Sequence, residues 1–183
     1  MHPAFLYLPG GRLAVSELSA ARLDGHLIEL GEGYIPADLV ESAAARASAI
    51  AALVPVDTAA SGPTSAWIHG AGDVPPPIHH VRRAVARRIR PVLTHRVRFH
   101  DTALPVDAFV QLGGIAVMTP VRTMVDLALG LHRDESLRRW MVLLAEVDAS
   151  LAAEAATAMS TLSRVPGTRA ARGALERLAV RTR

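Results

Sequence analysis

Apolar residues recur at helical spacing through the last third of the chain. In residues 134–151, Leu137, Met141 and Leu144 share one face, which predicts an amphipathic helix. Residues 152–165 continue the helical pattern to a break at Pro166-Gly167. Residues 168–183 then form a second amphipathic helix with a basic polar side. The C-terminal third is therefore predicted to be helical.

Three earlier helices are predicted by their start and stop residues. Residues 13–24 end at Gly25, and Trp67 is expected to be buried in a short helix between Pro63 and Gly70. The firmest prediction is a helix over residues 38–54. Its start is assigned to an Asp38–Glu41 capping box, and Pro55 ends it.

Alternating or glycine-punctuated segments predict strands. Residues 27–28 and 34–35 flank a Gly-Glu-Gly turn, which indicates a small hairpin. A helix followed by a hairpin fits the second half of a winged helix, and equally any small α+β entry segment. Residues 109–118 predict a second hairpin closed by Gly113-Gly114, which is expected to extend the arginine-rich strands before it.

Those arginine-rich strands are predicted within residues 74–112. Residues 93–100 alternate, with Leu93, Val97 and Phe99 on one face and basic residues on the other. Residues 81–90 fit either helical spacing or a strand with a turn, and we favour the strand.

The pattern as a whole indicates an α+β fold. We expect a small antiparallel or mixed sheet, at about residues 78–118, packed by helices. The predicted domains are a truncated winged-helix-like segment at 1–37, an α+β core at 38–132 and a helical region at 133–183.

Composition excludes several classes of site. The 183 residues include no cysteine, so disulfides, cysteine nucleophiles and thiolate zinc sites are impossible. All 20 basic residues are arginine, which excludes a Walker A lysine and a Schiff-base lysine. No long apolar run or signal peptide is present, so we expect a cytoplasmic protein without a membrane segment.

Charge is unevenly distributed. Residues 74–100 hold seven arginines and no acid, and residues 164–183 hold six arginines and one acid. Residues 1–73 instead hold three arginines and eight acids, a net charge of −5. A basic block can attract phosphate or an acidic partner, although solvated surface would look the same. The candidate nucleic-acid contacts are Arg82, Arg83, Arg87, Arg88, Arg90, Arg96 and Arg98.

Catalytic and metal sites have little support. Four histidines (79, 80, 95 and 100) lie on two predicted strands, but neighbouring strand residues point to opposite faces, so His79 and His80 cannot easily share a metal. An enzyme would have to gather His69, Asp107 or His100 in one concave site. We expect no catalytic residue, cofactor or metal.

The segment from 113 to 130, GGIAVMTPVRTMVDLALG, has a structural interpretation. Thr119 can cap a helix that starts at Pro120, and Arg122 and Asp126 stand four residues apart, where they can pair. Thr123 can bond back to the backbone.

Three segments together resemble the actinobacterial AbiEi-type antitoxins and transcriptional regulators of type IV toxin–antitoxin systems. They are GHLIELGEGYIPAD, GPTSAWIHG and LPVDAFVQLGGIAVMTPVRTMVDLAL. The motif residues are Trp67, His69, Gly70, Thr119, Pro120, Arg122, Thr123 and Asp126.

The resemblance implies a non-enzymatic regulator with a winged-helix part. Its implied partners are operator DNA and a nucleotidyltransferase-like toxin encoded nearby. About 35 residues precede the capping-box helix, and the wing carries Glu29 and Glu32. We therefore expect a shortened winged helix, no endonuclease-like domain, and DNA contact through the arginines at 82–98. The alternative is a protein-interaction module that has lost DNA binding, with the oligomeric state left open.

Overall fold

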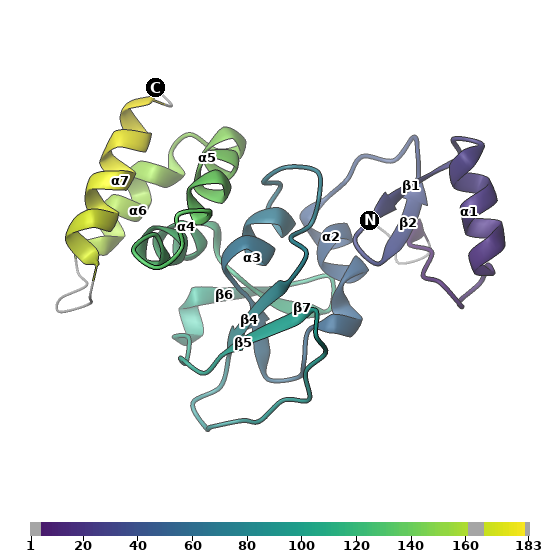
Figure 1. The fold of residues 1–183 in the computed structure, drawn as a ribbon, viewed down its shortest axis with the longest axis horizontal. Coiled ribbons are helices and arrows are strands. Elements are labelled where there is room, and N and C mark those ends of the chain that lie inside the picture. Colours follow the sequence, from purple (N-terminus) through teal and green to yellow (C-terminus); the bar gives the residue numbers. More distant parts are fainter. Residues whose placement is uncertain (1–4, 161–166, 182–183) are drawn as a thin grey trace.

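The computed structural model describes residues 5–160 and 167–181 as an α+β fold (Figure 1). It contains a two-stranded sheet near the N-terminus, a five-stranded mixed sheet in the middle and a helical C-terminal part. The predicted α+β class is confirmed. The predicted break at Pro166 lies outside the described residues. No helix in the described residues is long and apolar enough to cross a membrane.

The N-terminal unit consists of one helix and one hairpin. Helix α1 (Val15–Leu23) ends before Gly25, which has a φ of +76°. Strands β1 (Leu27–Leu30) and β2 (Gly33–Pro36) pair antiparallel, as the glycine pattern predicts. Leu18 is fully buried, and α1 packs against β1.

Helix α2 is shorter than predicted. It spans Ala43–Ala49 and is followed by the 3₁₀ turn η2 (Ala51–Leu53). The Asp38–Glu41 capping box is wrong. Ser42 is the N-cap, and its Oγ accepts a hydrogen bond from the Ala45 amide at 3.2 Å.

The five-stranded sheet has the order β5-β4-β3-β7-β6. Its strands are β3 (Thr58–Ala60), β4 (His79–Arg83), β5 (Val97–His100), β6 (Phe109–Leu112) and β7 (Ile115–Met118). β3 lies between β4 and β7, so the β6–β7 hairpin does not directly extend the arginine-rich strands as expected.

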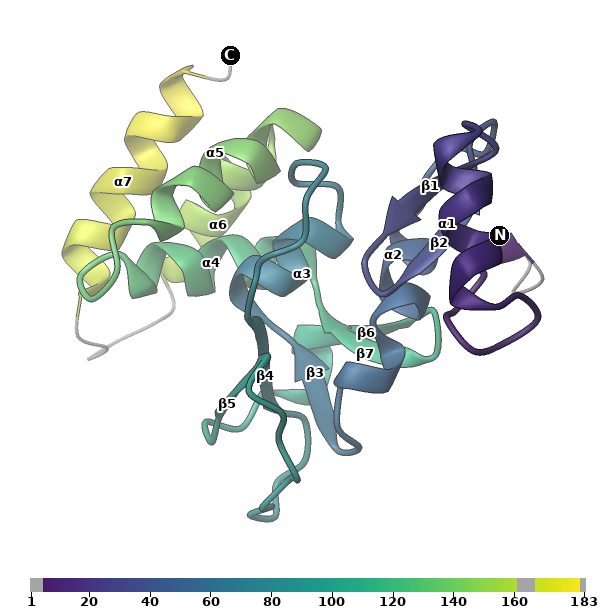
Figure 2. The ribbon, with the colours of Figure 1, turned by 45° about the vertical axis from the view of Figure 1, so that its right-hand side comes forward.

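The strands predicted at 81–90 and 93–100 are only partly correct. β4 ends at Arg83 and β5 begins at Val97, and the backbone between them is irregular. Leu93 is 42% exposed, because residues 84–96 project beyond the sheet and have no neighbouring strand (Figure 2). The turn η3 (Val106–Ala108) leads into β6.

Both faces of the sheet are covered. Ala60 and Val117 face α2 and α3 (Gly62–Ile68), where Trp67 is completely buried as predicted. Ala59 and Met118 face the opposite way, onto Leu104. Gly113, at a φ of +55°, lets the β6–β7 turn approach α2 so closely that a Cβ there would lie 2.5 Å from the Ser48 amide nitrogen.

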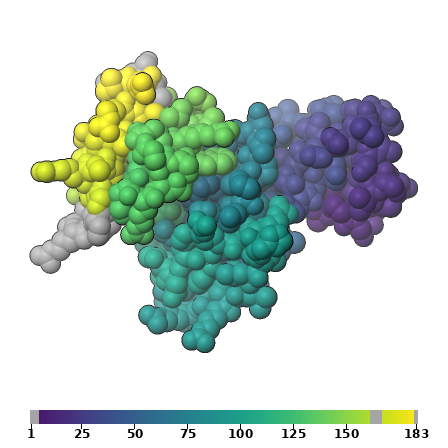
Figure 3. Space-filling view, viewed as in Figure 1, coloured from purple at the N-terminus to yellow at the C-terminus, as the bar shows by residue number. Residues whose placement is uncertain are grey.

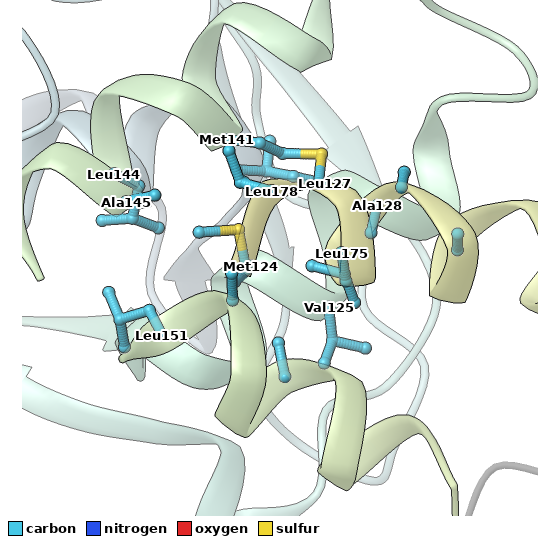
Figure 4. Packing of buried hydrophobic residues seen from close by; sticks show 14 of the residues in the cluster. Met124, Val125, Leu127, Ala128, Met141, Leu144, Ala145, Leu151, Leu175 and Leu178 are labelled. Carbon is cyan, nitrogen blue, oxygen red and sulfur yellow. The ribbon is translucent and has the colours of Figure 1, made fainter. Parts of the chain in front are cut away.

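The C-terminal helices share one apolar core (Figure 4). They are α4 (Pro120–Gly130), α5 (Leu137–Val147), α6 (Leu151–Met159) and α7 (Thr168–Arg181). Met124, Leu144 and Leu175 are completely buried in this core. The predicted helical C-terminal part is confirmed, but the single helix predicted over residues 134–151 and continued to 165 is wrong, because the chain leaves the helix at Asp148 and begins α6 at Leu151.

Candidate nucleic-acid interface

The seven candidate arginines lie along one edge of the sheet. Arg82 and Arg83 end β4, and Arg98 lies on the edge strand β5. The others belong to the irregular segment between these strands, which we call the arginine loop (residues 84–96). β4 and β5 run parallel, and this places the two ends of the loop at opposite ends of the strand pair.

Four of the seven arginines form ion pairs with acids from elsewhere in the chain. Arg82 Nη2 contacts Asp126 Oδ1 at 2.6 Å, and Arg83 Nε contacts Asp101 Oδ1 at 2.9 Å. The remaining pairs are Arg87 with Asp57 and Arg96 with Glu32, the latter bidentate at 2.5 and 2.6 Å. Their charge is therefore largely balanced within the protein, which the local sequence did not indicate.

Arg88, Arg90 and Arg98 keep their charge unpaired. All three are exposed, and across residues 5–160 and 167–181 none of them forms an ion pair. His95 is exposed in the same loop, and Val92 is 95% exposed. The unpaired arginines of the basic run therefore form a small exposed surface on a projecting loop and an edge strand. Such a surface suits phosphate contacts rather than base reading.

A histidine pair lies beside this surface. His80 on β4 and His100 on β5 meet at 3.3 Å between Nδ1 and Nε2. Burial, the neighbouring His100 and Arg98 lower the pKa of His80 to about 4. Burial and then Arg82 lower the pKa of His100. Both imidazoles are therefore neutral near pH 7 and add no positive charge to the interface.

The structure places no three metal-ligating side chains together among its described residues. His79 is completely buried on the opposite face of β4 from His80, as the alternation of a strand predicts, and His95 is in the loop. Burial, followed by Arg96, lowers the pKa of His79. His69, Asp107 and His100 are engaged in different places: His69 bonds to the Met118 carbonyl, His100 contacts His80, and Asp107 lies in the turn η3.

The predicted Arg122–Asp126 pair is wrong. Asp126 pairs with Arg82 instead, and this contact ties α4 to the sheet. The Nε of Arg122 is buried and has no hydrogen-bond partner among the described residues. The predicted cap is confirmed, because Thr119 Oγ1 accepts from the Arg122 amide at 3.3 Å.

Several motif residues converge on one carbonyl. The Met118 carbonyl oxygen, at the end of β7, is 2.7 Å from His69 Nε2 and accepts from Ser65 Oγ at 3.0 Å. Ser65 Oγ also lies 2.7 Å from Thr123 Oγ1. Burial lowers the pKa of His69, while its bond to Met118 opposes that shift. These residues join α3, β7 and α4, so their role in the structure is to hold the helices on the sheet.

Sequence reasoning missed Arg46. This side chain is only 7% exposed, and its guanidinium donates to the carbonyl oxygens of Trp67 and Gly72 at 2.8 and 2.7 Å. Glu41 balances its charge at 2.6 Å. The sequence does offer one indication of this role: Arg46 is the single arginine in an alanine-rich helix whose other side chains are small.

Comparison with known proteins identifies the family. The sequence model of the AbiEi antitoxin C-terminal domain matches residues 58–177. No curated protein matches the chain. Among solved structures, the chain is similar to the RV2827C protein from Mycobacterium tuberculosis, with 14% identity and a TM-score of 0.36 over 93% of this chain and 70% of that one. The family match spans well over half of the sequence, and the chain therefore belongs to the AbiEi antitoxin C-terminal domain family.

Proposed function

We propose that this antitoxin-family protein acts by binding rather than by catalysis. In this proposal it contacts operator DNA through the arginine loop and β5, and it counters a nucleotidyltransferase-like toxin encoded nearby. The observation that supports the DNA contact is the exposure of Arg88, Arg90 and Arg98 without ion pairs among the described residues. Family membership supports the antitoxin role.

The contact with DNA would be electrostatic. Guanidinium groups on a loop and an edge strand neutralise phosphates and release counterions, so affinity falls steeply as salt rises. The N-terminal hairpin is a poor alternative, because Glu29 and Glu32 lie on its first strand and its turn. Glu29 pairs with Arg22 and Glu32 pairs with Arg96, so neither arginine is free to meet a phosphate at the hairpin.

Gel shift on the protein's own promoter, at low and at moderate salt, tests the DNA contact. Retardation at low salt that weakens at moderate salt is the expected result. An absence of retardation under both conditions would remove DNA from the proposal. It would leave the alternative function, a protein-interaction module, which the internal pairing of four arginines favours.

A growth assay tests the antitoxin role separately. The neighbouring nucleotidyltransferase-like gene is induced alone and then with this chain, wild type or Arg88→Ala/Arg90→Ala. Rescue by both forms is expected, since the substituted arginines are assigned to DNA and not to the toxin. Failure of the wild type to rescue growth would contradict the antitoxin proposal and leave the DNA result unaffected.

A further inference from the structure

The outer part of the arginine loop, residues 88–93, is a single extended segment, which we call the loop tip. No turn, bend or backbone hydrogen bond occurs in it within the part of the chain that the structure describes. Pro91 has no amide hydrogen to pair with another strand, and it favours an extended conformation for Arg90 before it. The loop projects from the lower end of the molecule as an unpaired chain (Figures 2 and 3).

The base of the loop is held in place by Arg83. Its Nη1 donates to the carbonyl oxygens of Val85 and Arg87 at 3.2 and 3.0 Å, and also to that of Ala86. Its Nη2 donates to the carbonyl oxygen of Asp101 at 3.2 Å. These bonds fix the direction in which the loop leaves the sheet, so that a partner would meet a loop that is already ordered.

Exposure alternates along the loop tip. Arg88 and Arg90 are exposed and Val92 is 95% exposed, whereas Ile89 and Pro91 between them are half-buried. In an extended chain every second side chain has the same direction, at a spacing of about 6.7 Å. One side of the loop tip therefore presents two guanidinium groups followed by an apolar side chain.

The dimensions of this side match the minor groove of duplex DNA. That groove is about 6 Å wide, which excludes a helix or a two-stranded ribbon but admits a single extended arm. The spacing of Arg88 and Arg90 covers about two base pairs, since these are stacked about 3.4 Å apart. In A·T-rich tracts the groove is narrow, and its enhanced negative potential attracts arginine.

We propose that the loop tip enters the minor groove of A·T-rich DNA. Arg88 and Arg90 lie along the groove, and Val92 packs against the sugars that line it. In G·C pairs the guanine amino group projects into this groove as a hydrogen-bond donor. Arginine and valine side chains cannot accept from it, so that donor would be buried without a partner.

This inference rests on the proposed DNA contact, to which it adds the groove and the base composition. A guanidinium in the groove still neutralises phosphate charge and displaces counterions, so the contact keeps its dependence on salt.

Binding of the full chain to three duplexes of equal length tests the choice of groove. The first is an A-tract and the second contains only G·C pairs. The third replaces each guanine with inosine, which removes the amino group from the minor groove and leaves the major-groove edge unchanged. By fluorescence anisotropy at low salt, the A-tract should bind about tenfold more tightly than the G·C duplex, and inosine should restore most of that difference.

Arg88→Lys/Arg90→Lys separates the groove from simple charge. Lysine keeps the positive charge, but its ammonium group is more strongly hydrated and is harder to bring into a narrow groove. The ratio of A-tract to G·C affinity should therefore fall to about threefold or less. Arg133→Lys/Arg139→Lys, at two exposed arginines outside the loop, is the matched control and should keep the ratio of the wild type.

Three results would overturn the proposal. Equal affinity for the three duplexes would leave the DNA contact in place and restrict it to the outer phosphates. A preference for the A-tract that inosine does not restore, or that the lysine variant retains, would assign the selectivity to another part of the protein. No binding to any duplex at low salt would remove the proposed DNA contact and this inference together.

Discussion

Arg82 Nη2 on β4 lies 2.6 Å from Asp126 Oδ1 on α4, and this ion pair joins the sheet to the C-terminal helices across 44 residues of sequence. Both side chains are about 15% exposed. Removing one partner leaves the other charge in a poorly solvated place, which costs more than the pair itself contributes.

A double-mutant cycle measures this contact. Arg82→Ala and Asp126→Ala should each lower the free energy of urea unfolding by about 2 kcal/mol, with a coupling of about 1 kcal/mol or more between them. Arg122→Ala combined with Asp126→Ala is the matched control, and its coupling should stay below about 0.5 kcal/mol. Equal coupling in both cycles would mean that Arg122 also pairs with Asp126.

The histidine pair predicts an acid-sensitive fold. The pKa of His80 is about 4 in the folded protein against an ordinary value of 6.5, so the unfolded chain binds more protons between these pH values. The free energy of unfolding therefore keeps its full value above about pH 6.5, as far as His80 is concerned, and decreases as the pH falls toward 4. His79, His69 and His100, whose pKa values are also lowered, add to the same trend.

Thermal melts across this range check the prediction. His80→Gln should flatten the decline in Tm between pH 6.5 and 4, because the substituted side chain takes up no proton on unfolding. His95→Gln, in the exposed arginine loop, serves as the control, and its profile of Tm against pH should match that of the wild type. A His80→Gln profile as steep as that of the wild type would show that this imidazole does not govern the acid response.

Arg46 is predicted to be a large single contributor to stability. Arg46→Met should cost about 3 kcal/mol, because two carbonyls and Glu41 lose their partner in a mostly buried place. The arginine also stacks 5.3 Å from the Trp67 ring, so tryptophan fluorescence should change in the folded state. Arg22→Met, which removes an exposed pair with Glu29, should change stability by less than about 1 kcal/mol. A similar effect of the two substitutions would refute the assignment.

The Arg96–Glu32 pair is predicted to hold the N-terminal hairpin on the sheet. Arg96→Ala should raise hydrogen exchange in residues 27–36 while leaving α5 to α7 protected, because the bond joins only the hairpin turn to the start of β5. Arg87→Ala removes the more exposed pair with Asp57 and provides the comparison. Unchanged exchange in the hairpin after Arg96→Ala would show that apolar contacts alone hold it.

The elements that the sequence predicts well are those with local signals. Thr119 and Pro120 define the start of α4, and Gly113-Gly114 define the β6–β7 turn, since capping and positive φ depend on neighbouring residues. β3 escaped prediction because Thr58-Ala-Ala is short and shows no alternation. The start of α2 was misplaced because Asp38–Glu41 and Ser42 are competing caps, and Glu41 pairs with Arg46 five residues later instead of capping the helix.

The interface was harder to predict than the fold. The seven arginines are visible as a run, but the acids that pair with them lie far away in sequence, as Glu32 does from Arg96. Only the folded chain separates the paired arginines from Arg88, Arg90 and Arg98. The sequence placed His80 and His100 on two strands, but it did not predict their contact, which depends on the parallel register of β4 and β5.

The salt dependence of DNA affinity tests the central claim most directly. Fluorescence anisotropy on a promoter fragment gives log K against log salt for the wild type, Arg88→Ala/Arg90→Ala and the charge-matched control Arg133→Ala/Arg139→Ala. The account predicts that the slope for Arg88→Ala/Arg90→Ala is shallower than that of the wild type by about 1.8, which corresponds to the loss of two phosphate contacts. The control should keep the slope of the wild type. Equal slopes for the two variants would contradict it.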